Sequence, residues 1–379
     1  MARTRGGRME GLTASDRRWL FGIGVCYAVV VIPIGVHKGG DFTAELSQSE
    51  RLLHGLPLYD ALPGTGIWWP PFTALGLVPF ALVARASLTV AKALWAILNV
   101  ACLGWGIALA RRWTHGWAPV AIAVAAVGKP LQSNFEHLNI TPILLALVLA
   151  TAADLRGGHE RRAGVWLGLA TAIKAFPALM FLYFICTGRW RGLLVGIAVA
   201  GGLTLGAMLP YGPAGAVHAV LDWTRLGREA AALGKPGSQS IPGFAAFLGW
   251  PPAAIAALCL ACLAGGAVAL RRSSDAHLVG VAVAGLLAVL LSPIAWLYYH
   301  TLAMPAWLAA LTGRPIGAPP RRATLWVAGL LTSGVLTFGL YPRWLGFISA
   351  ANYTWGSLLL LTVLVFDRLR PPQPIPRSP

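Results

Sequence analysis

Apolar runs recur along almost the whole chain, from residue 19 to residue 366, and they constrain the fold more than any other feature. Several approach the length of about 20 residues that a helix needs to cross the hydrocarbon core of a bilayer. The chain is 57% hydrophobic and only 11% charged, which is too few charges to cover a water-soluble globule of 379 residues. Backbone polar groups inside hydrocarbon must be paired within the chain, so we expect the runs to be helices. We predict an all-α polytopic membrane protein with about 12 transmembrane helices.

The net charge of +17 reflects where the basic residues lie along the chain. With the N-terminus inside, most of the 30 Lys and Arg residues fall in tails and inner loops, as do the pairs Arg17-Arg18, Arg111-Arg112 and Arg271-Arg272. Such a bias is the positive-inside rule, and it indicates that both termini are cytoplasmic. A nucleic-acid surface would instead need a contiguous basic patch, so we expect no nucleic-acid partner.

One transmembrane domain, residues 19–366, is predicted between a basic tail at 1–18 and a Pro-rich tail at 367–379. Two polar interruptions, 37–87 and 211–250, fall on the outer side as the first and second extracytoplasmic loops. The five cysteines lie within apolar runs, and we interpret them as buried side chains.

The first outer loop carries four of the thirteen carboxylates: Asp41, Glu45, Glu50 and Asp60. From Asp41 to Leu53, leucines recur at helical spacing against polar residues, which predicts an amphipathic helix on the membrane surface. The apolar run from Trp68 to Ala84 is short and begins Trp-Trp-Pro-Pro. If it crossed the membrane, every later arginine cluster would change side. We therefore predict an interfacial or re-entrant helix there.

Two further polar features are predicted on the outer side. Residues 132–139 form a polar turn between two spans and carry Glu136, His137 and Asn139. Lys174 lies between two short apolar runs, where Pro177 must break the helix. Because both runs have basic inner flanks, the hinge points outward with Lys174 at its tip.

This topology collects carboxylates, cations and aromatic residues on one outer face. Ionisable groups at membrane depth are costly unless paired, so they favour a functional hypothesis. Cations bind phosphate, aromatic faces bind a sugar and a prenyl chain, and a carboxylate can remove an acceptor proton. Together these groups indicate a site for a sugar phosphate carried on a lipid.

The order of motifs resembles the polytopic GT-C glycosyltransferases, and in particular glycosyltransferase family 87, the polyprenyl-phosphate-mannose-dependent alpha-mannosyltransferases. The motifs are GGDF at Asp41, LLHGLPLY, WPP, AGVWLGLATAIKAFP at Lys174, SQS at Ser240 and SPIAW at Trp296. The sequence departs from the family pattern before Asn139, where Glu136-His137-Leu138 stands in place of Gly-Gln. It also departs after Trp296, where His300 comes one step later than the family's histidine.

The resemblance implies a GT-C-like bundle with an inverting active site outside the plasma membrane. A hexose, with mannose as the leading candidate, would pass from a polyprenyl-phosphate sugar to a lipid or glycan acceptor. Asp41 would be the catalytic base, with His300 as a second catalytic residue. Donor and acceptor contacts would come from Glu45, Glu136, His137, Asn139, Lys174, Arg225, Arg228, Ser240 and Trp296. No metal or other cofactor is expected, since cations can neutralise the leaving phosphate, and the expected partners are membrane lipids and the two substrates.

Other interpretations stay open. A transporter or a lipid-linked sugar flippase would use the same charges for passage, and a membrane scaffold would leave Asp41 far from Lys174. Polar residues gathered on one side of the membrane favour the enzyme. Asp41 could also be a helix N-cap, and Lys174 could extend its amine to the interface. The sequence leaves open the acceptor, the linkage, the oligomeric state, and whether the sugar is mannose, arabinose or glucose.

Overall fold

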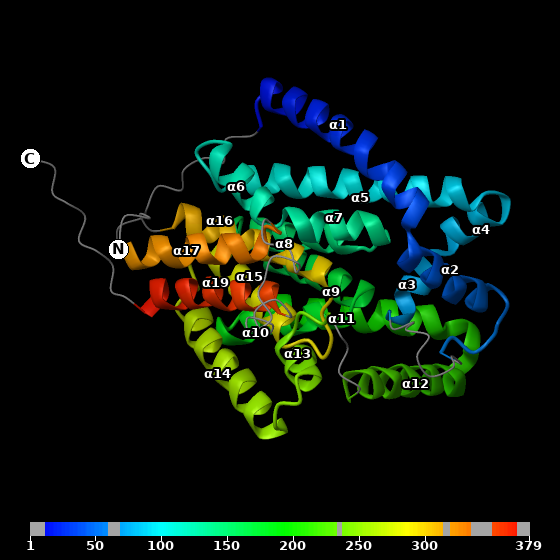
Figure 1. Ribbon diagram of the computed structural model, residues 1–379. Helices are drawn as coiled ribbons and strands as arrows, with labels where there is room; N and C mark the ends of the chain where they lie inside the picture. The colour runs from blue at the N-terminus through cyan, green and yellow to red at the C-terminus, as the bar shows by residue number, and fades with distance from the viewer. Residues whose placement is uncertain (1–11, 60–68, 233–236, 314–318, 335–350, 370–379) are drawn as a thin grey trace, which may run out of the picture.

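The computed structural model describes residues 12–59, 69–232, 237–313, 319–334 and 351–369. The described residues form α- and 3-10 helices joined by turns and loops, without strands, which confirms the all-α prediction (Figure 1). Residues 1–11 and 370–379 of the predicted tails, Asp60 and Trp68 lie outside the described residues, as does the side chain of Arg228.

In chain order the elements are α1 (Ala14–Lys38), α2 (Gly40–Leu53), α3 (Pro71–Gly76), α4 (Val78–Ala86), α5 (Leu88–Arg111), α6 (Ala118–Ala126), α7 (Gly128–His137), α8 (Thr141–Arg156), α9 (Glu160–Ile173), η1 (Phe176–Met180), α10 (Phe181–Cys186), α11 (Trp190–Met208), η2 (Leu209–Tyr211), α12 (Gly212–Ala232), α13 (Ile241–Phe247), α14 (Pro252–Arg271), α15 (His277–Leu290), η3 (Leu297–Ala303), α16 (Met304–Thr312), α17 (Pro319–Thr332) and α19 (Asn352–Leu369).

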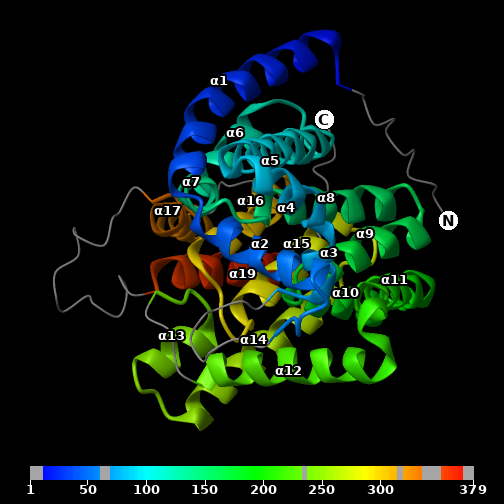
Figure 2. The same ribbon diagram turned by 90° about the vertical axis from the view of Figure 1, so that its right-hand side faces the viewer.

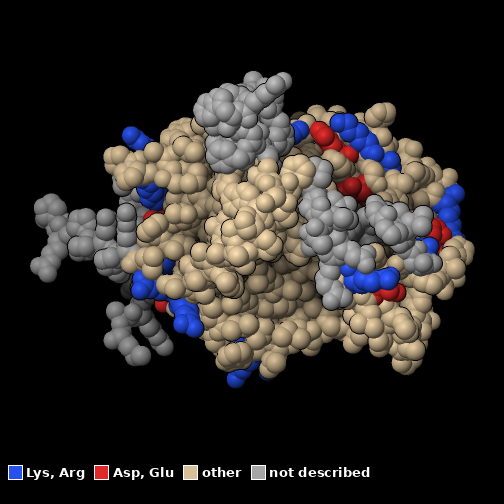
Figure 3. All heavy atoms as spheres, turned by 60° about the horizontal axis from the view of Figure 1, so that its bottom comes forward, with Lys and Arg blue, Asp and Glu red and all other residues tan. Residues whose placement is uncertain are grey.

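Four segments of the described chain are long and apolar enough to cross a membrane: α1, α5, the continuous stretch Trp190–Gly227, and α14. Lys, Arg, Asp and Glu gather towards two opposite ends of the face in Figure 3, with an uncharged surface between them. The chain is therefore a helical membrane protein, as predicted. The finer prediction of about twelve crossing helices is not confirmed, because many of the apolar runs form short or interrupted helices.

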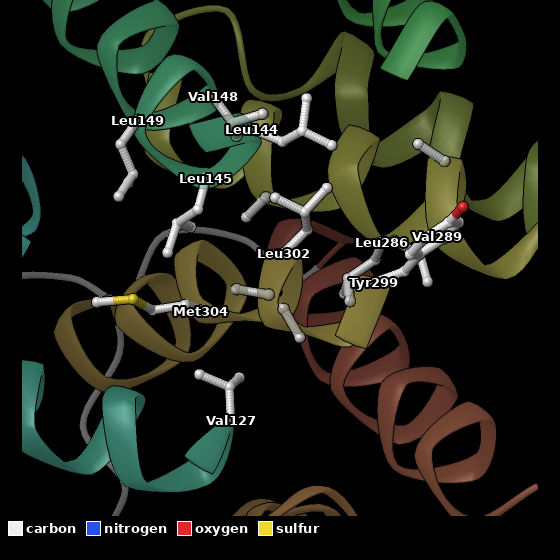
Figure 4. Close-up of a cluster of buried hydrophobic side chains, with 14 of the residues drawn as sticks. Val127, Leu144, Leu145, Val148, Leu149, Leu286, Val289, Tyr299, Leu302 and Met304 are labelled. Carbon is white, nitrogen blue, oxygen red and sulfur yellow. The ribbon is translucent and has the colours of Figure 1, made fainter. Parts of the chain in front are cut away.

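Helix α15 lies at the centre of the core. Its sequence is apolar on all sides, as expected for a helix covered all round, and almost every residue is buried. It contacts α8, α14, α16, α19, η1 and η3. Figure 4 shows Leu286 and Val289 of α15 near Leu144 of α8 and Leu302 of η3. This packing holds η3, which carries two tyrosines of the site described below.

Glycines bring α9 and α11 together. Gly164 and Gly168 of α9 face Gly192 and Gly196 of α11, and both pairs have G-x-x-x-G spacing. A Cβ atom at Gly168 would lie 2.5 Å from the Gly196 carbonyl oxygen and 2.9 Å from Cβ of Val199. Small residues at this spacing let helix backbones approach closely. The contact positions α9, whose C-terminal end leads into Lys174.

The predicted amphipathic helix from Asp41 to Leu53 is confirmed as α2. The predicted break at Pro177 is also confirmed, because α9 ends at Ile173 and η1 begins at Phe176. The run from Trp68 to Ala84 forms two short helices, α3 and α4, within the described residues. Much of the predicted loop 211–250 is helical, since it contains α12 and α13.

The prediction of a polar turn at residues 132–139 was wrong. Residues up to His137 belong to α7, which continues because Leu131 and Phe135 bury one face of it. The turn begins only at Leu138, with φ of 52°, and there the amide of Asn139 donates to the carbonyl oxygen of Asn134 at 2.9 Å.

The glycine contact predicts the effect of Gly168→Val. The added side chain meets the α11 backbone, and overpacking of this kind costs about 1–3 kcal/mol. We expect the midpoint of thermal unfolding in detergent to fall by about 3 °C or more. Gly202→Val on α11 is the matched control, because a Cβ atom there meets nothing within 4 Å. Equal midpoints for the two variants would contradict the close contact.

Candidate active site

A cavity of about 1280 Å³ lies among α2, the end of α9, η3 and α12. Figures 1 and 2 place α2, α3 and α12 at the same end of the molecule. The polar lining includes Asp41, Glu45, His137, Lys174, Ser292, Tyr298 and Tyr299. Apolar side chains from η1, η3, α12 and the segment after α15 form another part of the wall, among them Phe176, Leu179, Leu291, Ile294 and Leu297. The cavity thus joins a charged region to an apolar one.

Two donors hold the carboxylate of Asp41 in place. Its Oδ2 atom accepts hydrogen bonds from Nδ2 of Asn139 at 2.8 Å and from the hydroxyl of Tyr298 at 2.9 Å. Oδ1 receives no hydrogen bond from the described residues. The carboxylate is therefore oriented through one oxygen, and the other is available to a group in the cavity.

Lys174 is a buried cation, with 6% of its surface exposed. Its Nζ atom donates to Oδ1 of Asn139 at 3.3 Å. It lies 4.1 Å from the ring centroid of Trp69 and 4.8 Å from that of Tyr299. No carboxylate oxygen among the described residues lies within 4.0 Å of Nζ, the longest distance that counts as an ion pair. Ring faces stabilise the ammonium group without neutralising it, so the charge can bind an anion.

Asn139 connects the two charged groups. One side-chain amide donates to Asp41 through nitrogen and accepts from Lys174 through oxygen. The same oxygen accepts from the backbone amide of Ile140 at 2.9 Å, which restrains the side chain. Leu138, the residue before it, has the one positive φ among described non-glycine residues. Left-handed backbone is costly for leucine and common at functional sites.

Glu45 lies one turn after Asp41 on α2 and also lines the cavity. Only 4% of its surface is exposed, and Oε2 has no hydrogen-bond partner among the described residues. Burial raises the pKa of this carboxyl well above its usual value, and the nearby Lys174 only partly opposes the rise. Glu45 is therefore neutral over a range of pH in which an exposed glutamate is ionised.

The structure brings five of the predicted site residues to the cavity wall, namely Asp41, Glu45, His137, Lys174 and Trp296, with Asn139 directly behind them. Three others lie elsewhere. Glu136 of α7 pairs with Lys38 of α1 at 3.5 Å. Arg225 pairs with Asp222 of the same helix, α12, at 3.2 Å, and Ser240 caps α13. The roles proposed for these residues stay predictions.

His300 is buried behind the cavity wall. Its Nε2 atom lies 2.8 Å from the carbonyl oxygen of Gln239, and its Nδ1 atom lies 2.8 Å from Oγ of Ser357. Because a carbonyl only accepts, Nε2 carries the proton and the Ser357 hydroxyl donates to Nδ1. Both ring nitrogens are thus used to tie η3 to α19 and to the segment before α13. The side chain of His300 is not part of the cavity lining. Its catalytic role remains a prediction.

Apart from Trp296, the aromatic residues around Asp41 and Lys174 were not among the site residues predicted from the sequence. Tyr298 binds the carboxylate, Tyr299 and Trp69 flank the ammonium group, and Phe176 stacks on Tyr299 with ring centroids 4.7 Å apart. The available signal was the pair Tyr298-Tyr299 directly after SPIAW. In so aromatic a chain, sequence alone does not say which rings face a cation.

The apolar helices and the polar cavity define the chain as a membrane protein with a site suited to a lipid-borne anion. The chain belongs to glycosyltransferase family 87, whose family model matches residues 68–293. This confirms the resemblance found in the motifs. No solved structure matches the chain.

Three characterised relatives are similar at modest identity. A polyprenol-phosphate-mannose-dependent alpha-(1-2)-phosphatidylinositol mannoside mannosyltransferase of Mycolicibacterium smegmatis is 27% identical over 303 residues, which is 70% of this chain and 65% of the relative. A pentamannoside mannosyltransferase of the same organism, also named as polyprenol-phosphate-mannose-dependent, is 27% identical over 268 residues, 66% of this chain and 62% of the relative. A Mycobacterium tuberculosis protein with the same name as the first is 26% identical over 380 residues, 86% of this chain and 85% of the relative. The chain thus matches slightly less than two thirds of the length of the first two.

The contacts of His300 predict a structural effect of its removal. His300→Ala removes the buried hydrogen bonds to the carbonyl oxygen of Gln239 and to the hydroxyl of Ser357, and the loss of a buried partner costs about 1–3 kcal/mol. We expect the thermal midpoint in detergent to fall by about 3 °C or more, and Ser357→Ala to cause a smaller fall. An unchanged midpoint together with lost activity would favour the catalytic role for His300.

Proposed function

We propose that this chain is an integral membrane hexosyltransferase whose donor is a polyprenyl-phosphate sugar, with mannose as the leading candidate for the sugar. The sugar passes with inversion to a lipid or glycan acceptor on the extracytoplasmic face of the plasma membrane. The observation that carries the proposal is the side chain of Asn139, which binds Asp41 and Lys174 at once. A base is thereby held in one cavity with a cation that has no ion-pair partner among the described residues.

On the donor side, Lys174 binds the phosphate. As the bond between the anomeric carbon and the phosphate oxygen breaks, its electron pair stays on the phosphate, whose negative charge increases. An ammonium group already in place stabilises that charge in the transition state. The apolar wall that includes Phe176, Leu179 and Leu297 suits the prenyl chain.

On the acceptor side, Oδ1 of Asp41 takes the proton of the attacking hydroxyl. The hydroxyl oxygen bonds to the anomeric carbon on the face opposite the phosphate, which inverts the configuration. Tyr298 and Asn139 keep the carboxylate oriented while its charge is lost. General-base assistance of this kind contributes about 10²–10⁴-fold to a rate.

The names of the relatives support the choice of substrates. All three are named as polyprenol-phosphate-mannose-dependent enzymes that act on phosphatidylinositol mannosides. For this chain we accordingly propose mannose as the sugar and a membrane lipid as the first acceptor to test. The proposal keeps both termini in the cytoplasm and requires no metal or other cofactor.

Asp41→Asn tests the base. The amide keeps the shape of the side chain but cannot take a proton, so we expect transfer to fall at least about 100-fold. Membranes containing each variant are assayed with radiolabelled polyprenyl-phosphate-mannose. Glu50→Gln is the matched control, since Glu50 is on the same helix but pairs with Arg85 at the surface. Full activity in Asp41→Asn would remove Asp41 as the base, and an inert wild type with every lipid-linked sugar would favour transport.

Lys174→Met tests the phosphate contact. The methionine keeps the length of the side chain and its position against the rings but removes the charge. We expect the affinity for farnesyl phosphate to fall about tenfold or more, while the affinity for farnesol stays unchanged. Quenching of tryptophan fluorescence in purified protein measures both, because Trp69, Trp223 and Trp296 line the cavity. An equal loss for the phosphate and the alcohol would contradict the assignment.

A further inference from the structure

The cavity contains an acid that the proposed transfer does not use. Glu45 lines the wall together with Asp41 and Lys174, and its Oε2 atom is buried without a partner among the described residues. Gln48, one turn further along α2, is completely buried, and neither of its amide atoms has a partner there either. An unpaired buried polar group costs free energy, so a persistent one at a cavity wall points to a bound group.

The groups around Glu45 determine which form of the acid the site can hold. Asp41 faces it from the same helix, Lys174 from the end of α9, and Tyr59 from the segment after α2. Tyr298 and Tyr299 face it from η3, and His137 of α7 lines the same cavity. Lys174 is the one Lys or Arg in the described lining, so it is the cation available to both carboxyl groups.

The net charge of the site differs between the neutral and the ionised form of Glu45. With Asp41 ionised, Lys174 protonated and Glu45 neutral, the three groups sum to zero, and a phosphate can enter beside the ammonium group. An ionised Glu45 makes the sum negative and repels the phosphate in a poorly solvated site. The neutral acid also has a hydrogen to donate, which a carboxylate lacks.

We propose that Glu45 works as a neutral carboxylic acid that donates a hydrogen bond to the phosphate of the lipid-linked donor, opposite the ammonium group of Lys174. Glu45 is then a specificity residue for the phosphate and makes donor binding sensitive to alkaline pH. The assignment deepens the proposed function and rests on it for the identity of the ligand.

The sign of the pH effect follows from burial. Because burial raises the pKa of Glu45, the acid is neutral well below that raised value and ionises as the pH increases through it. Phosphate binding is therefore retained at lower pH and weakened at higher pH. Glu45→Gln preserves the shape of the side chain and a hydrogen-bond donor but cannot ionise. Its affinity for the phosphate should therefore fall less at alkaline pH than that of the wild type.

The experiment is titration of the purified full-length protein with farnesyl phosphate between pH 6 and pH 9, followed by tryptophan fluorescence. For the wild type we expect the dissociation constant to rise about tenfold more across this range than for Glu45→Gln. At pH 6 the two proteins should agree within about threefold, whereas Glu45→Ala should bind about tenfold more weakly. Titration of the phosphate itself occurs in every variant, so the difference between curves reports the ionisation of Glu45 together with its electrostatic effect on Lys174. Glu50→Gln, on the surface of the same helix, should follow the wild type.

Two results would overturn the assignment. Parallel curves for wild type and Glu45→Gln, with Glu45→Ala also binding as tightly as the wild type at pH 6, would show that Glu45 neither titrates against the ligand nor donates to it. Loss of binding in Glu45→Gln at pH 6 would show that an ionised carboxylate is required. The measurement does not depend on catalysis. A protein that shows the expected binding curves but transfers no sugar would therefore refute the proposed function and leave the role of Glu45 intact.

Discussion

The central interaction in this structure is an indirect one, in which the amide of Asn139 stands between a carboxylate and an ammonium group. A direct ion pair between Asp41 and Lys174 would satisfy both charges and leave neither for a substrate. Separation by a neutral amide keeps both groups oriented. The carboxylate can still accept a proton, and the ammonium group can still bind an anion. The cost is a buried charge without full compensation, which the surrounding fold must support.

That support comes from distant parts of the chain. The glycine contact between α9 and α11 positions the backbone of Lys174, and the left-handed turn at Leu138 positions Asn139. Packing of α15 against η3 places Tyr298 and Tyr299, one beside the carboxylate and the other beside the ammonium group. A change in any of these contacts would alter the site without touching a charged residue.

Sequence reasoning was accurate where local chemistry dominates. The helix around Asp41, the break before Pro177 and the grouping of Asp41, Asn139 and Lys174 followed from periodicity, proline and charge distribution. It was less accurate where packing overrides local polarity. Residues 132–137 look like a turn because they are polar, yet they remain helical because Leu131 and Phe135 are buried on one face. His300 was predicted from its motif as a second catalytic residue, and that role stays a prediction; its hydrogen bonds to Gln239 and Ser357 are tertiary contacts that the motif does not show.

The sequence by itself determined the class of protein, because recurrent apolar runs of this length in a chain with so few charged residues indicate a helical membrane protein. It also determined the family, since the order of its motifs matches the family pattern although single positions, such as Glu136 to Leu138, depart from it. Only the tertiary structure decided which polar groups meet. Hydrogen bonds and ring contacts to Asp41 and Lys174 act over a few ångströms between residues as far as 257 positions apart, and no local pattern encodes them. For the same reason, the lack of a hydrogen-bond partner for Oε2 of Glu45 among the described residues became visible only once α2, α9 and η3 were packed together.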